Sequence, residues 1–363
     1  MSIIILVLGL IILSLGAELL VRGASRLAAA LGMSPLVIGL TVVAFGTSAP
    51  ELVVSIQSSL AGQDDVAVGN VLGSNIMNVL FILGLSAVIV PLQVSKQLLR
   101  FDLMLMMAIS ILLAAMAFDG SIGRIEGLLL TVGLVSYITF SIVLSRKEQS
   151  KTPGERDVEV TSFSNQHGSR ETIVNLVLLA AGLGMLILGS QWFVHSAVMI
   201  ARSLGVSEFL IGVTIVAVGT SLPELATSIM AAIRGERDIA VGNVVGSNIF
   251  NIMGVVGISS AVSPDGLSMS QSALQFDLPV MVAVAVACLP AFFTGRVISR
   301  WEGGLFLAWY FAYVISLVIS VTSPELSASF SSLMMIAIPV TVGALLISVI
   351  TFVRSERSAA ALN

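Results

Sequence analysis

The stretch GTSAPEL at residues 46–52 continues to VGNVLGSNIMN at residues 68–78. The same pattern returns as GTSLPEL at residues 219–225 and VGNVVGSNIFN at residues 241–251. Each position of the second copy lies 173 residues after its counterpart (46 to 219, 78 to 251), with no gap between the two motifs. A duplication in constant register indicates an internal structural repeat.

Composition assigns both copies to a membrane. Of 363 residues, 56% are hydrophobic and only 10% are charged, whereas a soluble domain carries about 25% charged residues. The single cysteine, Cys288, excludes an intrachain disulfide. None of the three lysines follows a glycine-rich turn, so the sequence argues against an ATP-driven pump.

Apolar runs of about 20 residues, long enough to span a bilayer, predict eleven transmembrane helices. The first run has no basic segment before it, which favours a spanning helix over a cleaved signal peptide. We therefore expect an all-α membrane protein with two inverted-topology repeats of five helices plus one additional C-terminal helix. The predicted spans are residues 3–31, 34–61, 66–90, 101–118, 124–145, 173–203, 207–233, 239–262, 275–294, 300–321 and 330–353.

The division of the chain follows from these spans. Residues 1–145 form the first repeat, 146–171 a polar cytoplasmic linker, 172–322 the second repeat, and 323–363 the extra helix with a cytoplasmic C-terminus. Since each repeat crosses an odd number of times, the second enters the bilayer from the opposite face.

The basic residues predict the orientation. With the N-terminus outside, only Arg124 and Arg202 lie on the outer face, as the positive-inside rule requires. The expected location is the plasma (inner) membrane. The basic residues on the inner face are Arg22, Arg26, Lys96, Arg100, Arg146, Lys147, Lys151, Arg156, Arg170, Arg234, Arg237, Arg296, Arg300, Arg354 and Arg357.

Two carboxylates lie near the middle of their predicted spans. A charge at that depth costs about 2.5–3.5 kcal/mol, so Glu51 and Glu224 should face the bundle interior or a water-filled path. The prolines before them interrupt their helices. We expect carbonyls one turn earlier, around Ala44 and Ala217, to lose their usual partners and to face a cation.

Helical spacing places further oxygen atoms beside the carboxylates. Thr47 and Ser48 lie four and three residues before Glu51, on one side of its helix. On the next helix Asn70, Ser74 and Asn78 recur every four residues as a polar stripe, in which Asn70 is the member expected to be structural. The second repeat supplies the same arrangement, with Thr220, Ser221, Glu224, Asn243, Ser247 and Asn251.

Three further acidic residues are assigned other roles. Glu18 has a glutamine, Gln191, at the equivalent repeat position, which favours a structural role or a place on the ion path over membership of the symmetric site. Asp102 and Asp277 are expected to cap helices at the membrane interface.

The predicted ligands are all oxygen atoms. Such a set suits calcium and sodium far better than zinc or copper. Two glutamates balance one divalent ion, or equally monovalent ions or protons. Competition for the same carboxylates would couple the movement of one ion to that of the other.

The paired motifs GTSxPEL and GNxxGSNIxN, in ten inverted helices, resemble those of the sodium/calcium exchanger branch of the cation/calcium antiporter superfamily. The resemblance implies a mid-membrane site in which Glu51 and Glu224 bind calcium. It also implies that the first two helices of the two halves slide as a gating bundle. The assisting groups it implies are Thr47, Thr220 and the carbonyls of Ala44 and Ala217 for calcium, Ser48, Ser74, Ser221 and Ser247 for sodium, and Asn78 and Asn251 at the centre.

One residue departs from that pattern. Several members of the family have aspartate where this chain has Asn251, which leaves ion stoichiometry, potassium dependence and the choice of sodium or proton as counter-ion open. The leading hypothesis is a calcium/sodium antiporter that works by alternating access. A calcium/proton exchanger and a passive cation channel are the alternatives, and the absence of a nucleophile argues against an intramembrane enzyme.

The expected partners are calcium and sodium ions and the lipid bilayer. No cofactor and no nucleic acid are expected, and the sequence leaves the oligomeric state open.

Overall fold

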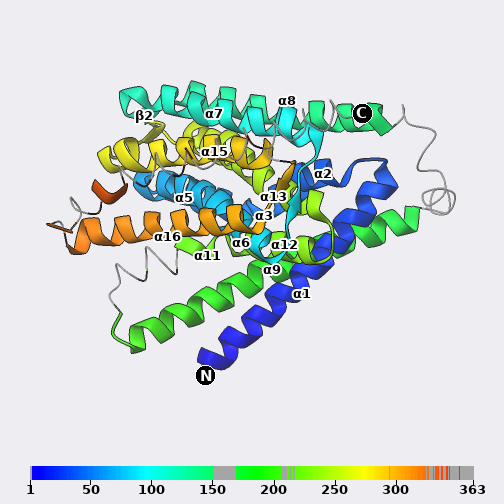
Figure 1. The fold of residues 1–363 in the computed structure, drawn as a ribbon, viewed down its shortest axis with the longest axis horizontal. Coiled ribbons are helices and arrows are strands. Elements are labelled where there is room, and N and C mark those ends of the chain that lie inside the picture. Colours follow the sequence, from blue (N-terminus) through cyan, green and yellow to red (C-terminus); the bar gives the residue numbers. More distant parts are fainter. Residues whose placement is uncertain are drawn as a thin grey trace.

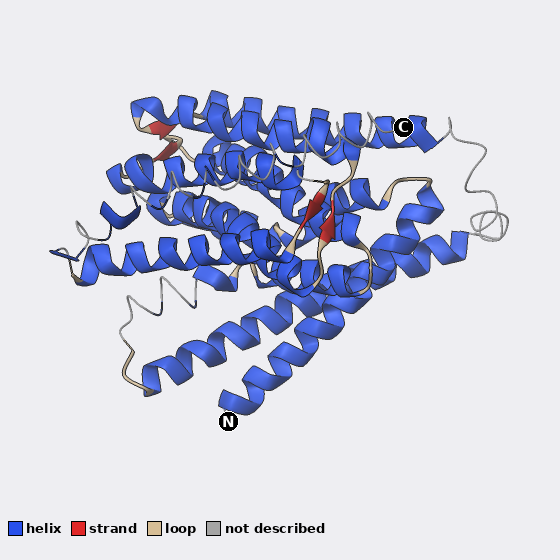
Figure 2. Cartoon of the chain, in the orientation of Figure 1, coloured by secondary structure: helices blue, strands red, loops and turns tan. Residues whose placement is uncertain are grey.

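The computed structural model describes residues 2–149, 169–206, 217–293 and 295–323, with residues 211 and 215 and scattered positions between 325 and 351. Figure 1 shows the helices stacked in one bundle, and Figure 2 shows that strands are confined to short connections. The first half comprises α1 (Ser2–Leu31), α2 (Pro35–Ile38), η1 (Gly39–Val43), α3 (Ala44–Thr47), α4 (Ala49–Leu60), α5 (Asp64–Met77), η2 (Asn78–Leu83), α6 (Gly84–Ile89), β1 (Leu92–Gln93), η3 (Leu98–Asp102), α7 (Leu103–Met116), η4 (Ala117–Asp119), β2 (Ser121–Ile122) and α8 (Arg124–Gln149).

The second half repeats this order. It comprises α9 (Ser169–Ser203), α11 (Ala217–Gly219), α12 (Leu222–Ile233), α13 (Arg237–Phe250), η6 (Asn251–Val256), α14 (Gly257–Val262), β3 (Leu267–Ser268), η7 (Ala273–Asp277), α15 (Leu278–Phe293), β4 (Val297–Ile298) and α16 (Arg300–Thr322).

The predicted spans are largely confirmed. The described residues contain eight helices long and apolar enough to cross a membrane, and a ninth span bent by 44° where Pro35–Thr47 meets Ala49–Leu60. Of the predicted span 207–233, the structure describes residues 211, 215 and 217–233, which include α11 and α12. The linker and the predicted span 330–353 fall mostly outside the described residues, so the division of the chain stays a prediction.

The connections between helices pair across the two halves. Strand β1, after the third span, pairs with β4, which precedes α16. Strand β2, which precedes α8, pairs with β3, which follows α14. The loop after the third span of one half therefore meets the loop before the last span of the other, as expected when the repeats enter from opposite faces.

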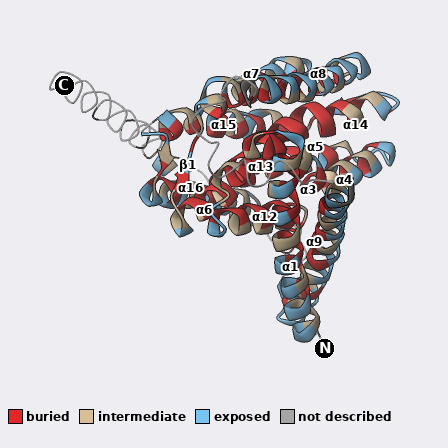
Figure 3. Ribbon diagram, turned by 90° about the vertical axis from the view of Figure 1, so that its right-hand side faces the viewer, coloured by how far each residue is buried: buried red, intermediate tan, exposed pale blue. Residues whose placement is uncertain are grey.

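The α1 and α9 helices lie side by side and extend away from the rest of the bundle (Figures 1 and 3). Their backbones are unusually close. A Cβ atom added at Gly182 would lie 2.7 Å from the Leu20 nitrogen, and one at Gly16 would lie 2.9 Å from the Gly182 oxygen. Glycine is required at this seam because a side chain would collide with backbone.

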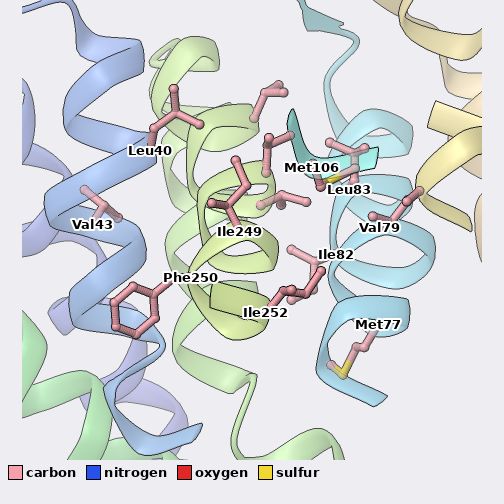
Figure 4. Packing of buried hydrophobic residues seen from close by; sticks show 14 of the residues in the cluster. Leu40, Val43, Met77, Val79, Ile82, Leu83, Met106, Ile249, Phe250 and Ile252 are labelled. Atoms are coloured by element: carbon pink, nitrogen blue, oxygen red, sulfur yellow. The ribbon is translucent and has the colours of Figure 1, made fainter. Parts of the chain in front are cut away.

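The centre of the bundle is formed by the α5–η2–α6 and α13–η6–α14 spans. Figure 4 shows their apolar side chains, among them Ile82 and Ile252, packed with Leu40 and Val43. A Cβ at Gly246 would lie 2.6 Å from the Leu40 oxygen, so α13 and η1 approach closely at this glycine. The segment equivalent to α2 and η1 in the second repeat falls mostly outside the described residues.

The expectation that Asp102 and Asp277 cap helices is wrong. Asp102 is fully buried inside a continuous helical span and accepts a hydrogen bond of 3.0 Å from the Tyr137 hydroxyl. Asp277 accepts one of 2.8 Å from Tyr313. Each carboxyl finds a hydroxyl partner on a neighbouring helix, so it can lie within its span.

Candidate cation-binding site

The two predicted carboxylates lie at the start of helices α4 and α12. Glu51 and Glu224 are both 0% exposed and stand in the first turn of their helices. Ser48 and Ser221 precede these helices with non-helical backbone, at ψ 5° and 10°. Each glutamate therefore faces the positive end of a helix dipole, which favours negative charge there.

One detail of the prediction around the proline is wrong. The Ala44 carbonyl accepts the Ser48 main-chain N–H at 3.0 Å and so keeps a helical partner. A proline removes the donor to the carbonyl four residues earlier, which for Pro50 is Gly46. Ala217 begins α11, and nothing is described of its side-chain surroundings.

Two serines cross between the halves and hold the carboxylates together. Ser48 Oγ donates to Glu224 Oε1 and Ser221 Oγ donates to Glu51 Oε1, each at 3.0 Å. Ser74 Oγ lies 3.5 Å from the same Glu51 oxygen and 3.1 Å from Ser221 Oγ. The site is therefore assembled from both repeats.

Four buried oxygen atoms of this site have no hydrogen-bond partner among the described residues. They belong to Glu51 Oε2, Glu224 Oε2, Asn78 Oδ1 and Asn251 Oδ1. A buried polar atom without a partner costs about 1–3 kcal/mol, and more when charged. Buried acceptors without a donor are atoms that a cation or proton can satisfy.

The predicted threonines bond to asparagines of the opposite repeat. Thr47 Oγ1 donates to Asn243 Oδ1 at 3.1 Å, and Thr220 Oγ1 donates to Asn70 Oδ1 at 3.3 Å. Thr47 also lies 3.5 Å from Ser247. A threonine of one repeat thus meets an asparagine of the other on both sides of the site.

Asn70 and Asn243 brace the interrupted helices. The Asn70 amide donates to the Glu51 carbonyl at 3.1 Å, and that of Asn243 donates to the Glu224 carbonyl at 3.4 Å. These bonds confirm the structural role expected for the pair.

The ligand set is limited to oxygen. The described residues contain no cluster of three or more His, Cys, Asp or Glu side chains of the kind that holds a metal ion. The candidate site therefore differs from such clusters, since it has two carboxylates. The two glutamates are joined only by neutral amides and hydroxyls, so the fixed charge at the site is −2 when both are ionised.

The sequence matches the family model described as sodium/calcium exchanger protein over residues 1–143 and 174–319. The chain belongs to the sodium/calcium exchanger family. As a member it is an antiporter of the membrane and not an enzyme.

Individual relatives extend this match over most of the exchanger. The sodium/calcium exchanger MaX1 of Methanosarcina acetivorans is 34% identical over 350 residues, which cover 87% of this chain and 98% of that protein. The inner membrane protein YrbG of Escherichia coli is 36% identical over 260 residues, 71% of this chain and 79% of the relative. A solved structure of the sodium-calcium exchanger NCX_Mj, soaked with zero Na⁺ and Ca²⁺, superposes with a TM-score of 0.74 at 33% identity, covering 87% of this exchanger and 98% of that chain.

Sequence reasoning missed two asparagines of the exchanger. Asn75 and Asn248 are almost completely buried and contact Asn251 and Asn78 of the opposite repeat. Both fall outside the four-residue stripe that singled out Asn78. Their repetition at the same motif position was the available signal.

Proposed function

We propose that this exchanger moves calcium and sodium in opposite directions through one shared site between the repeats. The observation that supports this most is the set of four unpartnered buried oxygens from Glu51, Glu224, Asn78 and Asn251. Calcium takes 6–8 oxygen ligands in flexible geometry. Its two charges equal those of the two carboxylates, so a bound calcium ion neutralises the site.

The remaining predicted groups complete the coordination. Ser48 and Ser221 already contact the carboxylates at 3.0 Å. With Ser74 and Ser247 they are proposed to serve sodium. The Ala44 carbonyl, which accepts the Ser48 main-chain N–H and lies 3.4 Å from Thr47 Oγ1, is proposed with the Ala217 carbonyl, Thr47 and Thr220 as a further group of ligands.

Exchange follows from electrostatic competition. Sodium ions that enter the site reduce its attraction for calcium, because both ions need the same carboxylate oxygens. An empty site would leave two buried negative charges without a partner, which disfavours return of the unloaded protein. The two ions are therefore expected to take turns.

The arrangement of the helices supports alternating access. The α1 and α9 helices contact one another along a glycine seam and also contact α12 of the site. We propose that this pair moves as one unit and opens the site to each face in turn. The proposed orientation places the N-terminus outside and the C-terminus in the cytoplasm, in the plasma (inner) membrane, on the distribution of basic residues.

Transport in liposomes tests the function. Purified protein in sodium-loaded vesicles is expected to accumulate external calcium only while the sodium gradient lasts. A pH gradient that drives uptake in place of sodium would identify a calcium/proton exchanger. Ohmic calcium current without counter-ion would indicate a channel, and either result would contradict the proposal.

A further inference from the structure

The two asparagines at the site are each held by an asparagine of the other repeat. Asn78 Nδ2 donates to Asn248 Oδ1 at 3.0 Å, and Asn251 Nδ2 donates to Asn75 Oδ1 at 3.1 Å. The amide nitrogens of Asn78 and Asn251 are used in this way, and their oxygens are the atoms left without a partner among the described residues.

This arrangement depends on which way the supporting amides point. A carboxamide has nearly the same shape when it is turned by half a revolution, and only its partners distinguish oxygen from nitrogen. If Asn75 or Asn248 were reversed, its NH₂ group would face the NH₂ group of Asn251 or Asn78. The site amide would then turn as well, and would direct hydrogens at the cation.

Two buried methionines lie where they prevent that reversal. Asn75 Nδ2 donates to Met281 Sδ at 3.5 Å, and Asn248 Nδ2 donates to Met106 Sδ at 3.6 Å. Asn248 Nδ2 also donates to the Asn75 main-chain carbonyl at 3.4 Å, so its orientation is held by two acceptors. A thioether sulfur accepts hydrogen bonds and cannot donate them, so it favours the amide nitrogen over the oxygen. Met106 and Met281 are 1% and 2% exposed, so water does not substitute for them.

The two sulfurs occupy equivalent places in the halves. Met106 lies four residues after Asp102 on α7, and Met281 lies four residues after Asp277 on α15. Figure 4 shows Met106 beside Leu83 in the central apolar cluster. Of the three intervening residues, two differ between the repeats, whereas the methionine is present in both.

We infer that Met106 and Met281 are positioning residues, each of which fixes the direction of a hydrogen-bonded relay that ends in an amide oxygen facing the cation. One relay runs from Met106 through Asn248 to Asn78. The other runs from Met281 through Asn75 to Asn251. The inference rests on the proposed site. It states that calcium affinity depends on two residues that do not themselves supply a ligand to the ion.

Substitution of the sulfurs by carbon tests the relays. Met106→Leu and Met281→Leu keep volume and apolar character, which buried sites tolerate well. Met281→Leu is expected to raise the KM for calcium about threefold, because one net hydrogen bond is lost. Met106→Leu is expected to raise it less, because the Asn75 main-chain carbonyl still accepts from Asn248, and the double variant should raise it at least about threefold. The maximal rate at saturating calcium should stay unchanged.

Glutamine restores an acceptor at the same place. Met106→Gln and Met281→Gln offer a side-chain carbonyl on an unbranched chain, and their KM should return to within about twofold of the parent protein, less than one hydrogen bond is worth. Met33→Leu is the matched control. Met33 is 4% exposed, and no hydrogen bond to its sulfur is found within the described residues, so this variant should keep the parental KM.

Wild-type KM in the Met106→Leu/Met281→Leu double variant would overturn the inference. So would a fall in maximal rate with unchanged KM, since that is the signature of general packing damage. If the leucine variants do not fold, the glutamine variants decide, because a raised KM in both would exclude an acceptor role. Glu51→Gln distinguishes failure of the proposed site from failure of the relays. Full calcium transport by that variant would overturn the site itself. Lost transport in that variant, together with a parental KM in the leucine variants, would overturn only the relays.

Discussion

The α13–η6–α14 span and the α1 helix show opposite relations between polarity and burial. The most apolar 18 residues of the α13–η6–α14 span are 100% buried, although the span contains Asn243, Ser247, Asn248 and Asn251. The corresponding stretch of α1 is more apolar and only 28% buried. Figure 3 shows this contrast between the buried centre and the α1–α9 pair.

The difference reflects the solvent that each region meets. Lipid is as apolar as leucine, so a leucine-rich helix gains little by leaving the lipid. Amides and carboxylates have no partners in lipid, so they gather where other polar groups can satisfy them. In this exchanger the buried centre is therefore recognised by its polar residues, and close backbone contact through glycine holds the peripheral pair.

Removal of a carboxylate charge should affect calcium transport far more in the buried centre than on α1. Glu51→Gln or Glu224→Gln is expected to lower calcium transport at least about 100-fold, the upper range for loss of a group that supports a metal site. Glu18→Gln on α1 is the control. Glu18 is paired with Arg22, and with Arg234 at 2.7 Å, at partly exposed positions where an ion pair contributes little.

The measurement is calcium uptake by equal amounts of each variant in sodium-loaded liposomes. Uptake by Glu18→Gln should remain within about threefold of the parent protein, as expected for a partly exposed pair. Equal losses in the central and peripheral variants would show that the position of a carboxylate in the bundle does not decide its role.

The crossed serines allow a finer test of the centre. Ser48→Ala and Ser221→Ala each remove a bond of 3.0 Å to a carboxylate of the opposite repeat. A hydrogen bond to a charged group contributes about 1.5–3 kcal/mol, so the KM for calcium or sodium should rise about tenfold or more. Ser14→Ala removes a bond to the Leu10 carbonyl on exposed α1 and should change neither KM.

Titration of uptake with each ion separates the two effects. If the serines mainly serve sodium, the sodium KM should shift more than that of calcium. A shift in Ser14→Ala as large as in the central variants would contradict the distinction between the regions.

The sequence predicted part of the buried polar centre, without Asn75 and Asn248, and did not predict how its atoms are paired. Duplication with an odd number of spans requires Glu51 and Glu224 to approach about a pseudo-two-fold axis, and periodicity placed Ser74 and Asn78 beside them. Spacing along one helix shows which residues share one side of that helix. It does not show which residue of the opposite repeat each of them contacts, so the bonds of Ser48 to Glu224 and of Asn78 to Asn248 could not be predicted.

Local geometry limited the prediction further. The η2 and η6 segments are π-helical and begin at Asn78 and Asn251. A π-helical turn changes the angular position of the residues that follow it, and such turns are frequent at functional sites. A pattern counted at 3.6 residues per turn therefore keeps its register up to Asn78 and Asn251 and loses it beyond them.

The smallest expected effect concerns the glycine seam of the peripheral pair. Gly182→Ala places a methyl group 2.7 Å from the Leu20 backbone nitrogen, and backbone cannot move aside as a flexible side chain can. Gly184→Ala, on the same helix, meets no atom of the described residues within 4 Å. We expect overpacking to destabilise Gly182→Ala by about 1–3 kcal/mol and Gly184→Ala to be neutral or slightly stabilising, since alanine favours a helix.

Thermal unfolding in detergent, followed for both variants with and without calcium, measures this difference. The calcium-induced rise in melting temperature should be the same in both, because the seam lies outside the site. Equal stability of the two variants would show that α1 and α9 separate readily, and the pair would then be unable to move as one unit during transport. A lower Gly182→Ala stability with an unchanged calcium response would instead tie the seam to the integrity of the pair and leave ion binding to the polar centre.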